Sequence, residues 1–182
     1  MKSFLRVLIG LLTVLMAVET VFAQTEKGDK ELSIAASFMS RKEEGESEAW
    51  TAFNIPVRLG FFVTENVEVE PEILLTKYEE EDAGYVLSGN LAYNITLSDP
   101  ESKTMPFFLG GFGFSNTIIY LPNFAWPGSE DETWTVVNLG GGFKFFMAKQ
   151  AALRFEYRFQ QFSGDWDFTY HNIFLGVSAF FE

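Results

Sequence analysis

The sequence of 182 residues has no cysteine and a single histidine, His171. Without cysteine, no disulfide can stabilise the fold in an oxidising compartment. The sequence also lacks zinc-type ligand spacing, the phosphate-binding loop, the dinucleotide-binding fingerprint and the G-x-S-x-G nucleophile motif. These absences remove the motif-based signs of a nucleotide-binding protein, a zinc protein or a serine hydrolase, and no cofactor or metal is expected.

Basic residues are scarce. The chain has 13 lysines and arginines against 25 aspartates and glutamates, which gives a formal net charge of −12. A nucleic-acid-binding protein needs a basic surface to neutralise phosphates. The charge balance therefore excludes a nucleic-acid partner.

Long apolar runs are also missing, except at the N-terminus. Lys2 and Arg6 are followed by an apolar run over residues 7–18 and by small residues up to Ala23. This order is typical of a secretory signal peptide, and the run is short of the roughly 20 residues that span a bilayer as a helix. We predict a signal peptide over residues 1–23 and one exported domain over residues 24–182. No cysteine follows the cleavage site to carry a lipid anchor.

Aromatic residues and two-residue alternation are abundant instead. The chain has 21 phenylalanines, and residues 153–160 alternate without a break between apolar side chains and polar or charged ones. A period of two predicts a β-strand with two different faces. The same pattern predicts eight strands, over residues 31–40, 50–63, 67–78, 85–97, 105–119, 133–147, 151–160 and 168–181.

Two strands are harder to interpret. Pro56 lies inside the second strand and has no N–H to donate, so we expect a β-bulge there. The fifth strand is rich in phenylalanine and glycine on both faces, and we place Phe108, Phe112 and Phe114 on the outward face.

The eight strands predict an all-β, eight-stranded antiparallel up-and-down transmembrane β-barrel. Strand number is even, and the links after odd-numbered strands are acidic and mostly longer than the others, as in outer-membrane barrels with extracellular loops and periplasmic turns. The alternative is a soluble barrel of the lipocalin type, whose apolar face would point inward. The export signal and the phenylalanine-rich faces favour the membrane barrel.

Four segments carry a family resemblance: residues 60–68 (GFFVTENVE), 106–114 (PFFLGGFGF), 153–158 (LRFEYR) and 175–181 (LGVSAFF). They resemble the OmpA-type small outer-membrane β-barrels, the outer-membrane protein β-barrel domain family. The resemblance implies the cell outer membrane of a Gram-negative envelope, contact with lipid and lipopolysaccharide, and insertion by the barrel-assembly machinery. The final strand is similar to the assembly signal of the family but ends in Glu182 where an aromatic residue is usual.

The inward parity of the predicted strands collects charges of both signs. The residues are Arg58, Glu68, Glu70, Glu72, Lys144, Arg154, Glu156 and Arg158. An eight-stranded barrel is only wide enough for side chains to fill, so buried charges must pair. We predict a structural ion network that plugs the lumen, with no open pore. The alternative is an ion path or gate in a small channel-forming or ligand-binding barrel.

An enzyme is the third hypothesis. Lipid A deacylases with this fold carry a serine two residues after their histidine, whereas residue 173 here is Ile173. A base must reach the proton of its nucleophile. His171 without such a serine predicts no enzymatic activity.

The predicted loops are acidic and contain Phe124, Trp126 and Trp166. Acidic loops can bind divalent cations that bridge lipopolysaccharide phosphates, or they can simply be solvated. The aromatic residues can contact an extracellular partner or belong to the aromatic belt at the membrane interface. Sequence analysis therefore predicts a monomeric outer-membrane barrel with a structural or surface-interaction role.

Overall fold

The computed structural model describes residues 25–41, 50–78, 84–99, 101–115, 133–164 and 167–182. The predicted signal peptide, residues 1–23, lies outside these ranges. Within them, no helix is long and apolar enough to cross a membrane.

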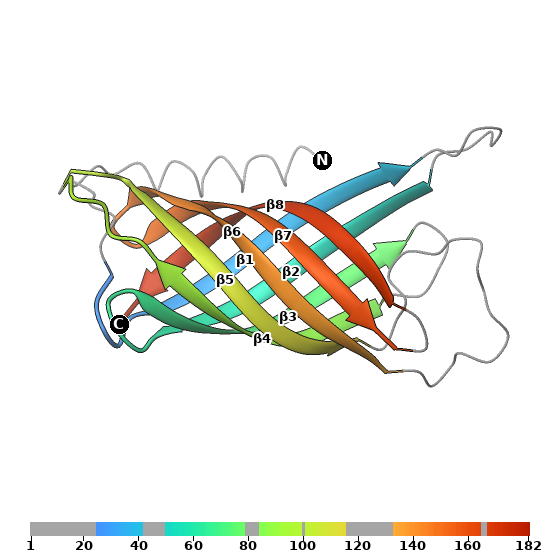
Figure 1. The fold of residues 1–182 in the computed structure, drawn as a ribbon. Helices are drawn as coiled ribbons and strands as arrows, with labels where there is room; N and C mark the ends of the chain where they lie inside the picture. Colours follow the sequence, from blue (N-terminus) through green and yellow to red (C-terminus); the bar gives the residue numbers. More distant parts are fainter. Residues whose placement is uncertain (1–24, 42–49, 79–83, 100, 116–132, 165–166) are drawn as a thin grey trace, which may run out of the picture.

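Eight strands form one closed antiparallel barrel in which each strand pairs with the next and β8 pairs with β1 (Figure 1). The strands are β1 (Lys30–Arg41), β2 (Trp50–Phe62), β3 (Val67–Tyr78), β4 (Gly84–Asn94), β5 (Thr104–Ser115), β6 (Trp134–Ala148), β7 (Ala151–Ser163) and β8 (Asp167–Phe181). The predicted strand number, order and up-and-down topology are confirmed.

The two faces of the barrel wall follow the two-residue period of the sequence. On β5, Phe108, Phe112 and Phe114 are 65%, 48% and 52% exposed, whereas Phe107 and Leu109 are 1% and 4% exposed. The outward face is therefore made of large apolar side chains, and charged residues lie inside. This is the reverse of a soluble barrel and is the arrangement that lipid requires.

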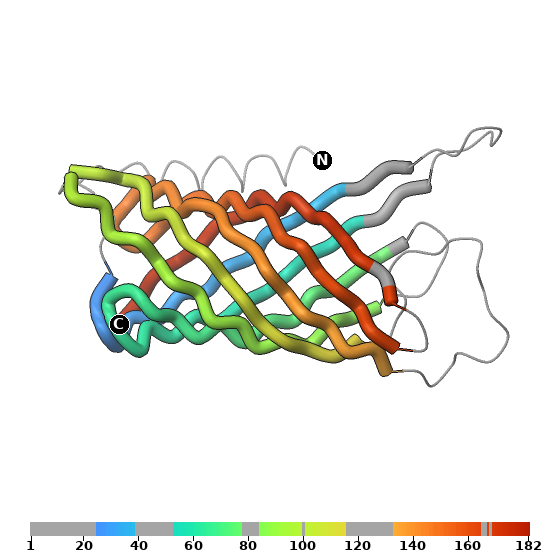
Figure 2. The backbone as a smooth tube through the Cα atoms, viewed as in Figure 1, coloured from blue at the N-terminus to red at the C-terminus, as the bar shows by residue number. Residues whose placement is uncertain are grey.

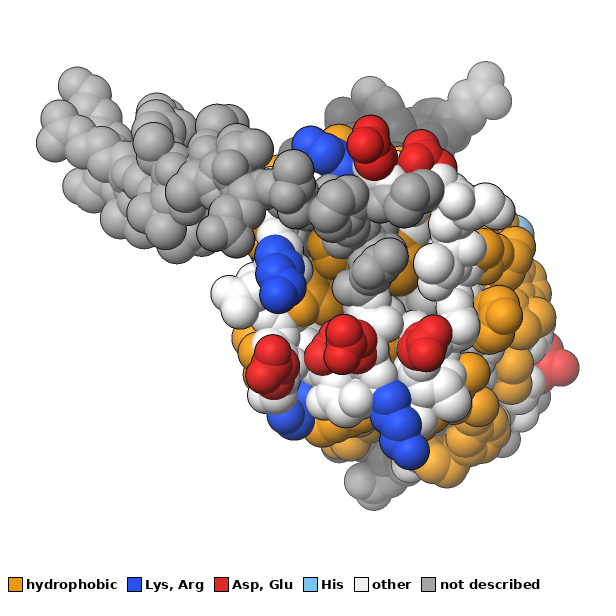
Figure 3. Space-filling model, turned by 90° about the vertical axis from the view of Figure 1, so that its left-hand side faces the viewer, with side chains coloured by type: hydrophobic (Ala, Val, Ile, Leu, Met, Phe, Trp, Pro, Cys, Tyr) orange, Lys and Arg blue, Asp and Glu red, His pale blue; other side chains and the backbone are white. Residues whose placement is uncertain are grey.

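The strands run obliquely around the barrel axis, as the backbone trace shows (Figure 2). The C-terminus lies at the end that carries the β2–β3, β4–β5 and β6–β7 turns, where the Phe180 N–H donates to the Gln150 carbonyl at 2.9 Å. Residue 28 lies at the same end, because the Gly28 N–H donates to the Phe62 carbonyl at 2.9 Å. We call this the turn end. Seen from it, charged side chains gather on the end of the molecule and hydrophobic ones cover part of the flank (Figure 3).

The predicted bulge at Pro56 is wrong. Ile34 pairs with Val57 and Ser37 pairs with Asn54, so the β1–β2 register is the same on both sides of the proline. Pro56 keeps its place opposite Leu74 of β3. The missing N–H removes pairs from the ladder with β1 but inserts no residue. A register shift does occur between two other described strands, β6 and β7, at Phe146 and Ala148.

Strand β4 ends at Asn94, three residues before the predicted end. The side chain of Asn66 explains the early end, because its Nδ2 donates to the Asn94 carbonyl at 2.8 Å and to Thr96 Oγ1 at 3.2 Å. The β4–β5 link therefore covers residues 95–103, longer than predicted. Conversely, β7 runs to Ser163, three residues beyond its predicted end.

The interior is layered along the barrel axis. An apolar cluster fills the turn end, and its members are Phe62, Met105, Phe146, Ala152 and Phe180. A second cluster lies toward the opposite end and contains Ala35, Leu74, Val86, Trp134, Val136, Phe162 and Phe174. Buried polar and charged side chains occupy the levels between them.

Candidate functional site

All eight residues predicted for the lumen lie inside the barrel, each at most 5% exposed. β2 supplies Arg58, β3 supplies three glutamates, β6 supplies Lys144 and β7 supplies two arginines and Glu156. The alternating backbone of each strand aims these side chains at the same central space. We call this group, together with Glu31 of β1, the ionic core.

One half of the ionic core is centred on Glu72 and Glu156. Arg158 donates to both carboxylate oxygens of Glu72, with Nη1 at 2.5 Å and Nη2 at 2.9 Å. Arg58 Nε also donates to Glu72. Glu156 accepts from Arg158 Nε at 2.7 Å and pairs with Arg154 Nη2 at 3.0 Å. β3 and β7 are not neighbours in the wall, so the Arg158–Glu72 pair crosses the lumen.

The other half lies nearer the turn end. Arg154 donates two parallel hydrogen bonds to Glu70, from Nη1 to Oε1 at 2.7 Å and from Nη2 to Oε2 at 3.1 Å. Such bidentate pairs are the strong form of arginine–carboxylate contact. Lys144 Nζ lies 2.7 Å from Glu68 Oε2 and also binds Glu31.

Glu31 is a member of the ionic core that the sequence analysis missed. It is 1% exposed and accepts from Ser178 Oγ at 2.5 Å and from Arg154 Nη1 at 3.3 Å. Glu31 lies two residues before Ser33 on β1, so the two-residue alternation already placed its side chain on the inward face with Ser33 and Ser37. Those small neighbours contain no charge, so this strand did not stand out as part of an ion network.

Aromatic rings pack against the cations. The Arg154 guanidinium lies 4.5 Å from the ring centroid of Phe107, and the Arg158 guanidinium lies 5.3 Å from that of Phe174. Lys144 Nζ lies 5.3 Å from the Phe62 ring and 5.8 Å from the Phe180 ring. Phe62, Phe174 and Phe180 belong to the two apolar clusters, and Phe107 belongs to a third buried cluster with Ala92 and Leu109. These rings contact the charged layer directly, and such contacts are favourable to a cation.

A ladder of amide side chains continues the polar interior beyond the ionic core. Asn172 Nδ2 donates to Gln160 Oε1, Gln160 Nε2 donates to Asn138 Oδ1, and Asn138 Nδ2 donates to Asn90 Oδ1, each at 3.0 Å. The ladder crosses β8, β7, β6 and β4. These hydrogen-bonded amides lie between the ionic core and the second apolar cluster.

Three carboxylates of the ionic core approach one another as metal ligands would. One oxygen from each of Glu31, Glu68 and Glu70 lies within 4.8 Å of the others. Lys144 and Arg154 already place cationic nitrogens on these same carboxylates. The group is therefore a protein ion network with its own counter-charges and is not assigned as a metal site.

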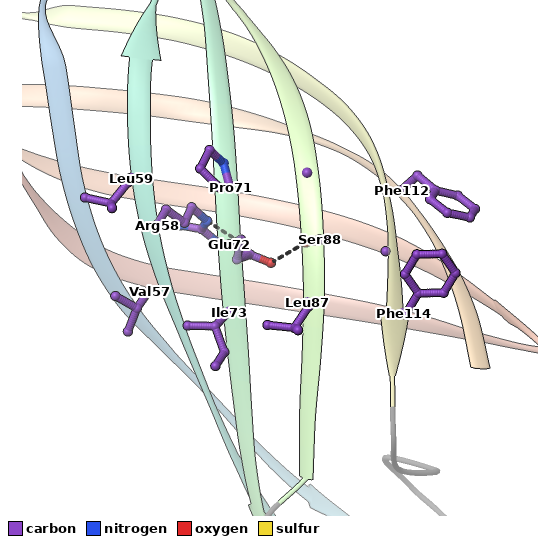
Figure 4. A pocket seen from close by; sticks show the side chains of 12 residues that line it. Val57, Arg58, Leu59, Pro71, Glu72, Ile73, Leu87, Ser88, Phe112 and Phe114 are labelled. Atoms are coloured by element: carbon purple, nitrogen blue, oxygen red, sulfur yellow. Dashed lines mark hydrogen bonds and ion pairs between the residues drawn. The ribbon is translucent and has the colours of Figure 1, made fainter. Parts of the chain in front are cut away.

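A shallow groove of about 500 Å³ lies on the outer wall between β2 and β5. Pro71 of β3 pairs with Gly89 of β4, and Phe112 of β5 pairs with Gly89 in turn. Gly89 lines the groove and adds no side chain to it. Leu59, Leu87 and Phe112 are among the apolar side chains that flank it (Figure 4). Arg58 and Glu72 lie behind this part of the wall, joined by their ion pair. The groove is an irregularity of the lipid-facing surface.

His171 lies on the outward face of β8, away from the ionic core. Its Nδ1 is 2.6 Å from the Tyr157 hydroxyl, and its ring meets the Phe159 ring edge to face at 5.4 Å between centroids. The residue two positions on is Ile173, which is 59% exposed on the same face. The imidazole therefore has an aromatic environment with a phenol partner, not a serine–histidine pair. Phe124, Trp126 and Trp166, predicted as loop contacts, lie outside the described residues.

Comparisons with known proteins agree with the barrel. Residues 9–181 match the family described as outer membrane protein beta-barrel domain. The chain belongs to this family. Its location is the cell outer membrane, where the apolar outer wall contacts lipid. No curated protein sequence matches the chain.

Solved structures share the fold at low sequence identity. The N-terminal β-barrel domain of OprF from Pseudomonas aeruginosa is 18% identical, with a TM-score of 0.56, covering 86% of this chain and 100% of that one. Neisserial surface protein A is 12% identical, with a TM-score of 0.61, covering 84% of this chain and 96% of that one. A de novo designed transmembrane β-barrel gives 9% identity and a TM-score of 0.51 over 87% of this chain and 99% of that one. At these identities the likeness establishes the fold alone.

Proposed function

We propose that the protein is a monomeric, non-conducting and non-enzymatic outer-membrane barrel with a structural or surface-interaction role. The observation that carries this proposal is the filled lumen. Each side chain of the ionic core is at most 5% exposed, and these side chains fill the centre of the lumen. An ion would have to break pairs such as Arg158–Glu72 to pass this level.

Breaking those pairs is costly. Removing one partner of a buried ion pair leaves an uncompensated charge and costs about 3–5 kcal/mol. The apolar clusters at both ends add a second obstacle, because they offer no polar group to a passing ion. A closed lumen supports the structural hypothesis over the channel-forming alternative.

Conductance across planar bilayers tests the closed lumen. The wild-type barrel is expected to give no steady current. The matched variant is the double substitution Glu72→Ala with Arg158→Ala, which removes both partners together and opens space at the centre. We expect this variant to conduct more than wild type. A steady wild-type current would contradict the proposal and favour a channel.

Surface interaction is assigned to the links at the end opposite the turn end, which contain Phe124, Trp126 and Trp166. Lipopolysaccharide is one partner to test, with divalent cations bridging its phosphates to acidic loops. The experiment compares wild type with a chain in which residues 116–132 are replaced by a short glycine-containing link. The role is supported if the chain with the short link binds fewer envelope or host components than wild type does. That chain must also keep the heat-dependent gel mobility of a folded barrel. Equal retention by both chains contradicts it.

Export and assembly follow from the same role. Residues 1–23 act as a signal peptide that is removed, and the barrel-assembly machinery inserts residues 24–182. The mature chain should start at Gln24, resist carbonate extraction and migrate faster on gels before boiling than after. N-terminal sequencing of membrane-extracted protein checks the cleavage site, and a soluble periplasmic product would overturn the assignment.

A further inference from the structure

The charges of the ionic core do not balance. Among the side chains that the structure describes, the buried carboxyl groups are Glu31, Glu68, Glu70, Glu72 and Glu156, and the buried cations are Arg58, Lys144, Arg154 and Arg158. Five acids face four bases. The apolar clusters at both ends separate this layer from bulk water and its counter-ions. An uncompensated charge in such an interior is costly, and a buried group neutralises instead.

Donors reach both oxygens of two acids near the centre. Glu72 Oε1 and Oε2 each accept from Arg158, and Arg58 adds a further bond to Oε2. Glu156 Oε1 accepts from Arg158 Nε at 2.7 Å, and Oε2 accepts from Arg154 Nε at 3.1 Å. These contacts satisfy two ionised carboxylates.

The same is true of two acids nearer the turn end. Arg154 binds both oxygens of Glu70. Glu31 receives Ser178 and Arg154 at Oε1 and Lys144 at Oε2. Both groups are therefore held as carboxylates.

Glu68 differs from the other four. Its Oε2 accepts from Lys144 Nζ at 2.7 Å and from Asn94 Nδ2 at 3.0 Å. Its Oε1 is buried and has no hydrogen-bond partner. A Cβ at position 60 would lie 1.8 Å from this oxygen, so Oε1 packs against the bare backbone of Gly60 on β2. The side chain as a whole is 0% exposed.

The surroundings of Glu68 also favour its neutral form. Glu31 of β1 and Glu70 of β3 each place a carboxylate oxygen within 4.8 Å of a Glu68 oxygen. The facing cations are Lys144 of β6 and Arg154 of β7, and each binds other acids as well. β4 contributes only the neutral amide of Asn94. Close carboxylates that share a site do not all ionise together.

We propose that Glu68 is a proton-binding site in the barrel lumen and holds its proton in the folded protein at neutral pH. Oε2 is then the carbonyl oxygen that accepts from Lys144 and Asn94, and Oε1 is the hydroxyl oxygen. One bound proton makes the ionic core neutral. Gly60 leaves the space in which the protonated oxygen lies.

Infrared spectroscopy of the folded protein in D₂O at a pH of about 8 tests the proposal. Exposed aspartates and glutamates are ionised there, since their pKa values are about 4. The carbonyl stretching band of a protonated carboxylic acid is expected in wild type and absent in Glu68→Gln. That variant should fold, because its amide oxygen can still accept from Lys144 and Asn94. The exposed-turn variant Glu101→Gln should keep the band, because it leaves the ionic core unchanged.

Three results would overturn the proposal: no such band in folded wild type, a band that persists in Glu68→Gln, or a band lost in the surface control Glu101→Gln.

Unfolding measured against pH gives a second readout. A proton held by the folded state and released on unfolding makes the folded state less stable as pH rises. Between pH values of about 6 and 8, the unfolding constant of wild type should rise by up to tenfold per pH unit relative to that of Glu68→Gln. His171 is present in both proteins, so its titration cancels in the comparison. Parallel pH profiles would contradict a proton on Glu68.

Discussion

Alternate residues of β7 lie in opposite environments. Arg154, Glu156 and Arg158 are at most 1% exposed, whereas Phe155 and Tyr157 are 36% and 44% exposed on the outer wall. The inward side chains depend on named partners at fixed distances, and the outward ones depend only on being apolar in lipid. The stability of the barrel therefore depends on individual polar atoms at the inward positions of this strand. At its outward positions, stability depends only on whether the side chain is apolar.

Removing one inward charge should give the largest effect. Arg158→Leu leaves Glu72 without its bidentate partner and takes a donor from Glu156. Breaking a buried pair costs about 3–5 kcal/mol, because the remaining charge stays buried. Reversible urea unfolding in lipid vesicles measures the loss. A change below that of an outward substitution on β7 would contradict the assigned role of the ionic core.

Glycines sharpen the comparison without involving charge. A Cβ at position 142 would lie 1.9 Å from the Phe155 carbonyl oxygen, whereas a Cβ at position 89 on the outer wall meets nothing within 4 Å. Gly142→Ala should therefore destabilise by about 1–3 kcal/mol through overpacking. Gly89→Ala is the matched control and should change the free energy of unfolding by less than about 0.5 kcal/mol. Equal losses would mean that the wall around residue 142 can move freely.

The amide ladder should be intermediate in sensitivity. In Asn138→Ala, Asn90 Oδ1 loses the hydrogen bond that it accepts from Asn138 Nδ2. Gln160 Nε2 loses the oxygen to which it donates. Leaving buried polar groups unsatisfied costs about 1–3 kcal/mol. Urea unfolding measures the loss, and Val137→Ala on the outward face is the neighbouring control. A smaller loss for Asn138→Ala than for Val137→Ala would show that water enters and replaces the amide.

The period of two was enough to predict the strands and their faces, even on β5. Pairing of the β7 arginines with the β3 glutamates was predictable from parity, but which glutamate each arginine binds was not. Arg158 and Glu72 are 86 residues apart and come from strands that are not neighbours, so their contact depends on the tilt and register of the closed barrel. The end of β4 depends on the side chain of Asn66, which lies in a different turn. The face on which a side chain lies can be read from its neighbours in the sequence. Its ion-pair partner and the end of its strand depend on how the closed barrel is arranged.

Glu31 illustrates the same limit. Its inward parity was readable, but its importance comes from Lys144 and Arg154, which lie more than 100 residues away in the sequence. Pro56 shows the converse, because a local rule predicted a bulge that the neighbouring pairs with β3 prevent. In both cases the closed barrel decided what the residue does.

The smallest effect is expected for Phe155→Leu on the outer wall. Phe155 stacks on Phe143 of β6 with 5.3 Å between ring centroids, and an aromatic pair adds about 0.5–1.5 kcal/mol beyond its apolar area. Leucine remains apolar, so lipid contact is kept and only part of the stacking is lost. We expect a loss of about 1 kcal/mol or less in the free energy of unfolding. The same urea titration that measures Arg158→Leu applies, with Phe143→Leu as the control for the stacked pair. Because both substitutions on β7 introduce leucine, their difference reports the face and not the new side chain. A loss for Phe155→Leu as large as that for Arg158→Leu would place Phe155 in a specific contact and remove the distinction between the two faces of the strand.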